Sequence, residues 1–259
     1  MHPFIVFEIF FFVLGTIFAS FAGVVASRLH TGTPMVKGRS RCDACGAVLS
    51  SLDLIPIVSY LLRRGRARCC GARVSIISTL GEILLGALFL LSYRTLGPTL
   101  ALGVFLASLV LLYTLVLYDL AHQILPPALL YPFVVLALFY LALTAPSTTT
   151  ILSSGLTALG IGLFLWLIYL FSRGRAMGFA DAPLAFALAL LVAPRALAGF
   201  AFSFWLGAAI GISMVALSKG GVRMKSEVPL APFLAAGFLL AYFIPWDPFA
   251  PLLALISSI

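Results

Sequence analysis

The sequence has very few charged residues. Lys, Arg, Asp and Glu together make up 9% of its 259 residues, whereas 63% of them are hydrophobic. A typical soluble domain has about 25% charged residues. This shortage of charge excludes an ordinary water-soluble enzyme and predicts an all-α polytopic membrane protein.

The sequence also lacks the motifs of common hydrolases and of nucleic-acid-binding proteins. It contains no G-x-S-x-G and no H-E-x-x-H, and its three histidines are His2, His30 and His122. Chemistry that depends on a nucleophile elbow or on a zinc-peptidase helix is therefore disfavoured. We find no convincing internal repeat or nucleic-acid motif, so no nucleic acid partner is expected.

Long apolar runs recur along nearly the whole chain. A spanning helix needs about 20 apolar residues, because about 30 Å of hydrocarbon is divided by about 1.5 Å per residue. The first run has no Lys or Arg before it and is too long for a signal-peptide core, so we expect it to remain as the first helix. The pattern predicts about eight transmembrane helices, at residues 4–27, 76–93, 98–121, 127–145, 150–171, 176–193, 197–217 and 229–245.

The positions of the basic residues predict the orientation in the membrane. Nine of them lie in the segment 28–75, two at positions 173 and 175, and three between 219 and 225, whereas only Arg94 and Arg195 fall on the other side. Because short basic loops stay in the cytoplasm, the amino terminus is predicted outside and the segment 28–75 inside. The net charge of +8 is explained by this topology.

Two aspartates interrupt the apolar runs, and they belong to different predicted helices. Asp119 lies near the end of 98–121 and Asp181 near the start of 176–193. An ionised carboxylate inside a bilayer costs about 2.5 to 3.5 kcal/mol, so such residues usually face a protein interior or a wet cavity. In the predicted orientation both lie near the cytoplasmic side, which indicates a shared task.

Two carboxylates held together in an apolar site share one proton near neutrality. The ionised one can take a proton from an attacking water while the protonated one polarises a peptide carbonyl, as in an aspartic protease. Gly178 lies in a small-residue turn and lets the backbone come close to a neighbour or a substrate strand. The alternative for Asp181 is that it is a simple helix cap at the membrane edge. His122 follows Asp119 by three residues on the same helix face, and it either hydrogen-bonds this carboxylate or lies in the interfacial region.

Glu82 is a third carboxylate at apolar depth. It lies about two turns into the run 76–93, in the stretch STLGEILLGALF. A structural bond to a neighbouring helix and a chemical role are equally open for this residue.

All four cysteines lie in the only sizeable polar segment, 28–75. The gap between Cys42 and Cys45 lets two thiolates bind one Zn²⁺, and Cys69 and Cys70 supply two more sulfurs. A cytoplasmic location keeps thiols reduced, which favours a metal over a disulfide. Adjacent cysteines in an extended chain point to opposite sides, however, so free loop thiols are the other interpretation.

Ordered motifs along the chain resemble those of the type IV prepilin leader peptidases, which are polytopic aspartic proteases of the bacterial inner membrane. No single motif is specific, but their order and spacing together are. Proteases of the presenilin kind also pair a Tyr-Asp with a Gly-x-Gly-Asp motif, but they lack the cysteine loop. The matching segments are ASFAGVVASRL at 19–29, KGRSRCDACGAVL at 37–49, DLIPIVSYLLRRGRARCCGARVS at 53–75, Glu82 followed by Gly86, YDLAHQILP at 118–126, MGFAD at 177–181 and VPLAPFLAAG at 228–237.

This resemblance implies a division of labour among the residues. Asp119 and Asp181 would be the catalytic pair, and Gly178 and Ala180 would shape the substrate site. The implied substrates are prepilins or pseudopilins of type IV pilus or type II secretion systems, whose leaders are cut on the cytoplasmic side. Many members of the family also methylate the new amino terminus with S-adenosylmethionine, and Glu82 is a candidate contributor to that second activity.

The chain departs from the family pattern at several positions. Ala180 replaces the second glycine of the Gly-x-Gly-Asp motif, and Ala67 replaces the third cysteine of the loop, with Cys69 as a displaced substitute. These changes bear on zinc binding and methylation more than on proteolysis. The other departures are Pro127, Ala182-Pro183 and Leu230-Ala231.

The predicted organisation is a first transmembrane helix at 1–27, a cytoplasmic cysteine loop at 28–75 and a transmembrane aspartic peptidase domain at 76–259. We expect a multi-pass protein of the bacterial inner membrane with an active site that faces the cytoplasm, and with prepilins, pseudopilins and membrane lipid as partners. Two other functions stay open. One is a non-catalytic, pilin-binding relative, and the other is a proton- or ion-coupled transporter that uses Asp119 and Asp181.

Overall fold

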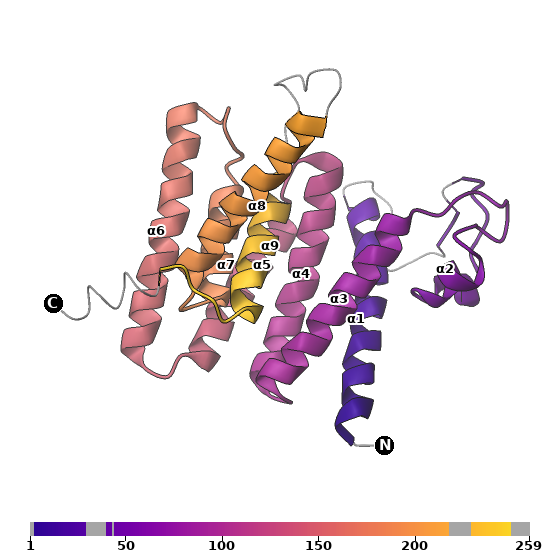
Figure 1. The fold of residues 1–259 in the computed structure, drawn as a ribbon, viewed down its shortest axis with the longest axis horizontal. Coiled ribbons are helices and arrows are strands. Elements are labelled where there is room, and N and C mark those ends of the chain that lie inside the picture. The colour runs from indigo at the N-terminus through magenta and orange to yellow at the C-terminus, as the bar shows by residue number, and fades with distance from the viewer. Residues whose placement is uncertain (1–2, 30–39, 43, 218–228, 250–259) are drawn as a thin grey trace. The chain divides into compact units, whose positions relative to one another are not determined.

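Helices are the main secondary structure of the residues that the computed structural model describes, which are 3–29, 40–42, 44–217 and 229–249. These residues form no strand, only two isolated β-bridges. The predicted all-α class is confirmed, and each of the eight predicted windows contains a helix. In chain order (Figure 1) the elements are α1 (Pro3–Arg28), η1 (Ser51–Leu54), α2 (Val58–Leu62), α3 (Ile76–Leu96), α4 (Leu100–His122), α5 (Pro127–Thr144), α6 (Thr148–Ser172), α7 (Asp181–Leu191), α8 (Ala196–Leu217) and α9 (Ala231–Phe243).

Six described helices are long and apolar enough to cross a membrane, namely α1, α3, α4, α5, α6 and α8. The other two apolar helices, α7 and α9, have 11 and 13 residues. At about 1.5 Å per residue their lengths are about 17 and 20 Å, less than the hydrocarbon thickness of about 30 Å. The windows 176–193 and 229–245 are longer than these helices because the flanking turns are apolar as well.

The chain divides into two compact units, residues 1–117 and 118–259, with the boundary inside α4. In the first unit α1 packs along α3. The contact is close enough that a Cβ on Gly15 would lie 2.7 Å from the carbonyl oxygen of Leu85, and one on Gly86 would lie 3.0 Å from that of Phe12. At one end of the pair, Arg94 donates two hydrogen bonds of 2.8 and 2.9 Å to the Glu8 carboxylate.

The second unit is arranged around α7. This helix contacts α5, α6, α8 and α9, and nine of its eleven residues are buried. Four of them are alanines, whose small side chains let neighbouring helices approach closely. The first residue of this surrounded helix is Asp181.

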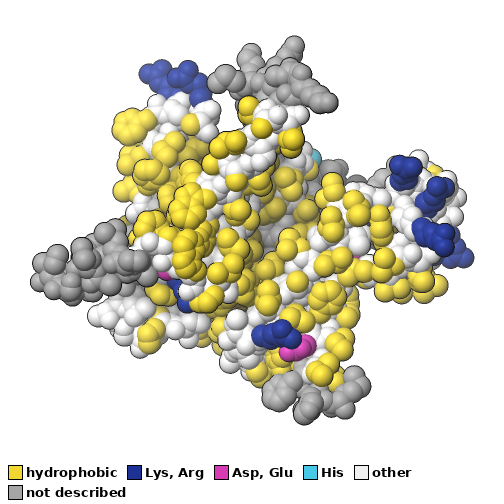
Figure 2. Space-filling view, viewed as in Figure 1, with side chains coloured by type: hydrophobic (Ala, Val, Ile, Leu, Met, Phe, Trp, Pro, Cys, Tyr) yellow, Lys and Arg dark blue, Asp and Glu magenta, His cyan; other side chains and the backbone are white. Residues whose placement is uncertain are grey.

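The surfaces of the long helices are apolar. Figure 2 shows hydrophobic side chains over most of the helical surface and basic side chains at helix ends and on the segment around α2. Phe171 and Leu217, for example, are 81% and 82% exposed. Such a surface is unstable in water but matches the hydrocarbon of a bilayer.

Gly237 offers a test of the packing between α8 and α9, because a Cβ there would collide with the backbone of Ser203. We expect Gly237→Ala to lower the free energy of unfolding by about 1 to 3 kcal/mol, as overpacking does. Gly211→Ala is the matched control, since a Cβ at Gly211 in α8 meets nothing within 4 Å. Thermal unfolding in detergent compares the two, and equal melting temperatures would contradict the described contact.

Candidate functional site

Asp181 is held by the turn that precedes α7. The backbone N–H of Gly178 donates to Oδ2 of Asp181 at 3.0 Å, and the N–H of Asp181 donates back to the Gly178 carbonyl at 3.3 Å. Ala180 occupies the N-cap position of the helix. The carboxylate of Asp181 thus bonds outside the helix, so the interpretation of Asp181 as a simple helix cap is not supported.

Ala180 fits this turn without strain. Its φ and ψ are −73° and −13°, a right-handed helical conformation that any L-residue adopts. A glycine would be needed at this position of the Gly-x-Gly-Asp motif only if the backbone φ were positive. Because the φ of Ala180 is negative, no glycine is required here.

Asp119 lies in the last turn of α4 and reaches the start of α9. Its Oδ2 accepts a hydrogen bond of 3.3 Å from the backbone N–H of Ala231, the first residue of α9. Sequence reasoning did not include Ala231 among the site residues, because a backbone donor leaves no side-chain signature. Its only signal was the motif VPLAPFLAAG at 228–237, in which Ala231 stands.

His122 follows Asp119 by three residues but does not hydrogen-bond its carboxylate. Its ring packs on Tyr118 with centroids 4.4 Å apart, and no hydrogen bond joins it to Asp119 within the described residues. This agrees with the interpretation of His122 as an interfacial residue.

The two aspartates form a buried pair in the second unit. Asp119 is 5% exposed and Asp181 7% exposed, and the two carboxylates lie close enough together to interact electrostatically. Each carboxylate has one oxygen fixed by a backbone N–H, while the other oxygen accepts no hydrogen bond from the described part of the chain. A pair of this kind can share a proton and can activate a water on its free oxygens.

Glu82 belongs to the first unit and binds the polar loop. Its Oε2 accepts a hydrogen bond of 2.8 Å from the backbone N–H of Ile57, and Ser20 of α1 lies beside its side chain. Glu82 is 8% exposed. The structure therefore joins Glu82 to the polar loop by a hydrogen bond, whereas the structural alternative expected a bond to a neighbouring helix.

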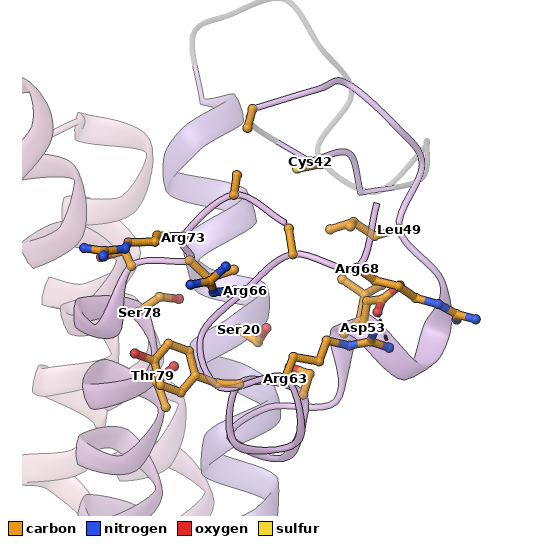
Figure 3. Close-up of a pocket in the computed structure, with 18 of the residues that line it drawn as sticks. Ser20, Cys42, Leu49, Asp53, Arg63, Arg66, Arg68, Arg73, Ser78 and Thr79 are labelled. Atoms are coloured by element: carbon orange, nitrogen blue, oxygen red, sulfur yellow. Dashed lines mark ion pairs between the residues drawn. The ribbon is translucent and has the colours of Figure 1, made fainter. Parts of the chain in front are cut away.

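A cavity of about 430 Å³ lies between this loop and the helices α1 and α3. Figure 3 shows Ser20, Ser78 and Thr79 on the helical wall and the arginines on the loop wall. One of these arginines is paired, because Arg63 and Asp53 form an ion pair of 2.7 Å. The lining includes Ser20, Cys42, Asp53, Arg63, Arg66, Arg68, Arg73, Ser78, Thr79 and Glu82.

The four cysteines come from two hairpin turns with the same backbone pattern. In the first, Cys42 donates to the Ala47 carbonyl and Gly46 donates back to the Cys42 carbonyl. In the second, the same two bonds join Ala67 with Ala72 and Gly71 with Ala67. Gly46 and Gly71 both have a φ of +70°, a conformation that favours glycine. Position 67 therefore corresponds to Cys42, position 70 to Cys45, and position 69 to Ala44.

The four sulfurs of Cys42, Cys45, Cys69 and Cys70 lie within 4.8 Å of one another. The Sγ atoms of Cys45 and Cys69 are 3.2 Å apart, and those of Cys42 and Cys70 are 3.8 Å apart. Tetrahedral Zn²⁺ with bonds of about 2.3 Å separates its sulfurs by about 3.8 Å. The arrangement therefore fits one tetrahedral metal ion.

Adjacent cysteines can share this cluster because their chain is not extended. Cys69 and Cys70 lie in a turn, with their sulfurs 3.9 Å apart, so the objection from opposite directions does not apply. Hydrogen bonds from the backbone N–H groups of Cys45 and Ala44 lower the pKa of the Cys42 thiol to about 7. A lowered pKa favours the thiolate, which is the form that binds metal. The hydrogen bond with the Cys45 sulfur, by contrast, raises the pKa of the Cys69 thiol to about 12, so a metal ion would have to displace that proton.

Comparisons with known proteins match both parts of the chain to one family. Residues 13–96 match the family model described as the bacterial peptidase A24 N-terminal domain. Residues 104–215 match the model described as the type IV leader peptidase family. No solved structure gives a significant match.

Curated relatives agree with these matches, and each is named prepilin leader peptidase/N-methyltransferase. The chain is 34% identical to the protein of Myxococcus xanthus over 85% of this chain and 67% of that protein. It is 29% identical to the protein of Bacillus subtilis over 89% and 92% of the two chains. It is also 32% identical to the protein of Klebsiella pneumoniae over 69% and 82%.

The sulfur cluster predicts that the purified protein carries about one zinc ion per chain. Cys69→Ser should reduce the zinc content strongly, because three sulfurs hold the ion less tightly. The double variant Cys69→Ala with Ala67→Cys should restore it, because position 67 corresponds to Cys42 in the other hairpin turn. Elemental analysis measures all three, and wild-type protein without zinc would contradict the metal site.

Proposed function

We propose a function for this chain, which belongs to the type IV leader peptidase family. Its curated relatives are named prepilin leader peptidase/N-methyltransferase. The six long apolar helices among its described residues make it an integral membrane protein. We propose that it is an aspartic endopeptidase that cleaves the leaders of prepilins or pseudopilins. The buried pair of Asp119 and Asp181 is the observation that carries this proposal.

In the proposed mechanism the two carboxylates share one proton. The ionised aspartate accepts a proton from water as the water oxygen attacks the scissile peptide carbonyl. The protonated aspartate donates a hydrogen bond to that carbonyl oxygen and, when the intermediate collapses, the leaving amine takes up a proton from the pair. The N–H groups of Gly178 and Ala231 fix one oxygen of each carboxylate, which leaves the other oxygen to face the reactants.

We further propose that cleavage takes place near the cytoplasmic surface of the bacterial inner membrane. Fourteen of the sixteen basic residues lie on the side that also holds both aspartates in the predicted topology. A prepilin leader is basic and stays in the cytoplasm, whereas the stem that follows is an apolar helix. The bond between the two parts must therefore be reached at that boundary.

The first unit would supply the second activity in the relatives' names, methylation of the new amino terminus. When bound, S-adenosylmethionine would supply the methyl group. The polar cavity that contains Glu82, Ser20 and Thr79 supports this assignment, because a carboxylate can orient an amine. A zinc ion held by the four cysteines would have a structural role there, since it would join the two hairpin turns of the loop.

Substitution of either aspartate tests the shared mechanism. We expect Asp119→Asn and Asp181→Asn each to lower the cleavage rate by several orders of magnitude, because an amide cannot exchange the proton. The measurement is cleavage of a prepilin-like substrate by purified protein in detergent or lipid. Cleavage that survives either change would exclude the pair as the catalyst, and an inactive wild type would favour a pilin-binding relative or an ion-coupled transporter.

Gly178 tests whether a backbone donor sets the geometry of the pair. Gly178→Pro removes the N–H that binds Asp181, and we expect it to lower the maximal cleavage rate at least tenfold. Gly178→Ala keeps the N–H and places a Cβ 3.4 Å from Oδ2 of Asp181, an ordinary contact, so its rate should stay near that of wild type. Equal losses in the two variants would show that crowding, and not the hydrogen bond, matters at this position.

A further inference from the structure

The segment 54–62 of the polar loop exposes large apolar side chains although it lies outside the long helices. Leu61 is 67% exposed and Leu62 80%, and Val58 is 46% exposed. Leu61 and Leu62 end the short helix α2. Exposed leucines gathered on one segment indicate a surface that is covered by something other than water.

A hydrogen bond sets the depth of this segment beside the helices. The N–H of Ile57 binds Glu82, which lies six residues after the start of α3 at Ile76, a distance of about 9 Å along the helix axis. Ser20 of α1, which lies beside Glu82, is eight residues before the end of that helix at Arg28, or about 12 Å. The segment therefore does not project into solvent beyond the helix ends, but turns back along two spanning helices.

At this depth the helices themselves expose apolar side chains. Leu80 and Leu84 of α3, on either side of Glu82, are each 55% exposed. Ile17 of α1, close to Ser20, is 50% exposed. Because α1 and α3 are long enough to cross a bilayer, the surface at this level faces the region between headgroups and acyl chains.

Basic residues follow directly after the apolar segment. Arg64 and Arg66 are exposed and form no ion pair within the described residues, whereas Arg63 is paired with Asp53. In Figure 2 the basic side chains on this part of the molecule lie above a hydrophobic lower edge. This order, with apolar side chains deeper and cations at the rim, is typical of interfacial anchors on anionic lipid.

We propose that residues 54–62 form an interfacial membrane anchor, in which Leu61 and Leu62 insert among the acyl chains of an anionic leaflet and Arg64 and Arg66 bind its phosphates. The anchor fixes the cavity of the first unit at the membrane surface. The inference does not depend on the proposed peptidase activity. A protein partner, including a pilin, is the alternative occupant that the experiment distinguishes.

Tryptophan fluorescence in lipid vesicles tests the anchor. The full chain is prepared with Trp166, Trp205 and Trp246 changed to Phe, and one tryptophan is introduced by Leu62→Trp. Val48→Trp is the matched control, because Val48 is also apolar, exposed at 47% and in the loop, but lies next to the first hairpin turn, where it is paired with Arg41. Both chains are reconstituted into vesicles of phosphatidylglycerol and phosphatidylcholine with bromine atoms either high or low on the acyl chains.

We expect the Leu62→Trp chain to show blue-shifted emission and several-fold stronger quenching by the shallow bromines than the Val48→Trp chain. Emission like that of indole in water, without quenching, would overturn the anchor. A blue shift that needs an added prepilin-like peptide would assign the surface to a protein partner and would overturn it as well. Unchanged helical circular dichroism and a single elution peak establish that each chain is folded.

A separate comparison tests whether the arginines bind anionic headgroups. In vesicles of phosphatidylcholine alone the quenching of the Leu62→Trp chain should fall, and adding Arg64→Gln and Arg66→Gln should lower it to the same level in the anionic vesicles. Equal quenching in both kinds of vesicle, with or without the arginines, would overturn the binding of anionic headgroups.

Discussion

A carboxylate in an apolar helical protein needs hydrogen-bond donors, and the starts of helices are where the backbone has N–H groups to spare. Three deep carboxylates of this chain use donors at the start of a helix or in the turn just before one. Glu82 binds the N–H of Ile57, the N-cap residue of α2, and Asp119 binds the N–H of Ala231, the first residue of α9. Asp181 binds the N–H of Gly178 in the turn before α7. The positive end of a helix also favours a negative charge nearby, so short helices make these acidic groups tolerable.

This constraint accounts for where the two short apolar helices begin. α7 and α9 do not have the length of a span, and each begins beside a carboxylate of the second unit. The N–H of Ala231 at the start of α9 binds Asp119, and that of Gly178 just before α7 binds Asp181. The starts of these helices are therefore part of how the site is built.

Much of this arrangement can be predicted from the sequence, because it follows from side chains. Apolar runs predict the eight helices, and the scarcity of acids draws attention to Asp119, Asp181 and Glu82. The backbone donors could not be predicted, since Gly178 and Ala231 act through groups that every residue except proline has. Three expectations stay predictions. The catalytic roles of the aspartates depend on a bound substrate, the orientation depends on a lipid bilayer, and the division at residues 27 and 75 depends on where the domains end.

The cysteine loop differs most from what its sequence suggests, because its backbone forms turns and is not extended at Cys69 and Cys70. A motif based on cysteine spacing assumes a fixed number of residues between the metal ligands. The two hairpin turns share their hydrogen bonds and their left-handed glycines, Gly46 and Gly71, yet one offers sulfur at its first and fourth positions and the other at its third and fourth. A ligand can thus move within such a turn while the scaffold stays the same. Searches that require C-x-x-C twice would overlook clusters of this kind, whereas a search for paired glycine-closed turns, each with any two cysteines, would find them.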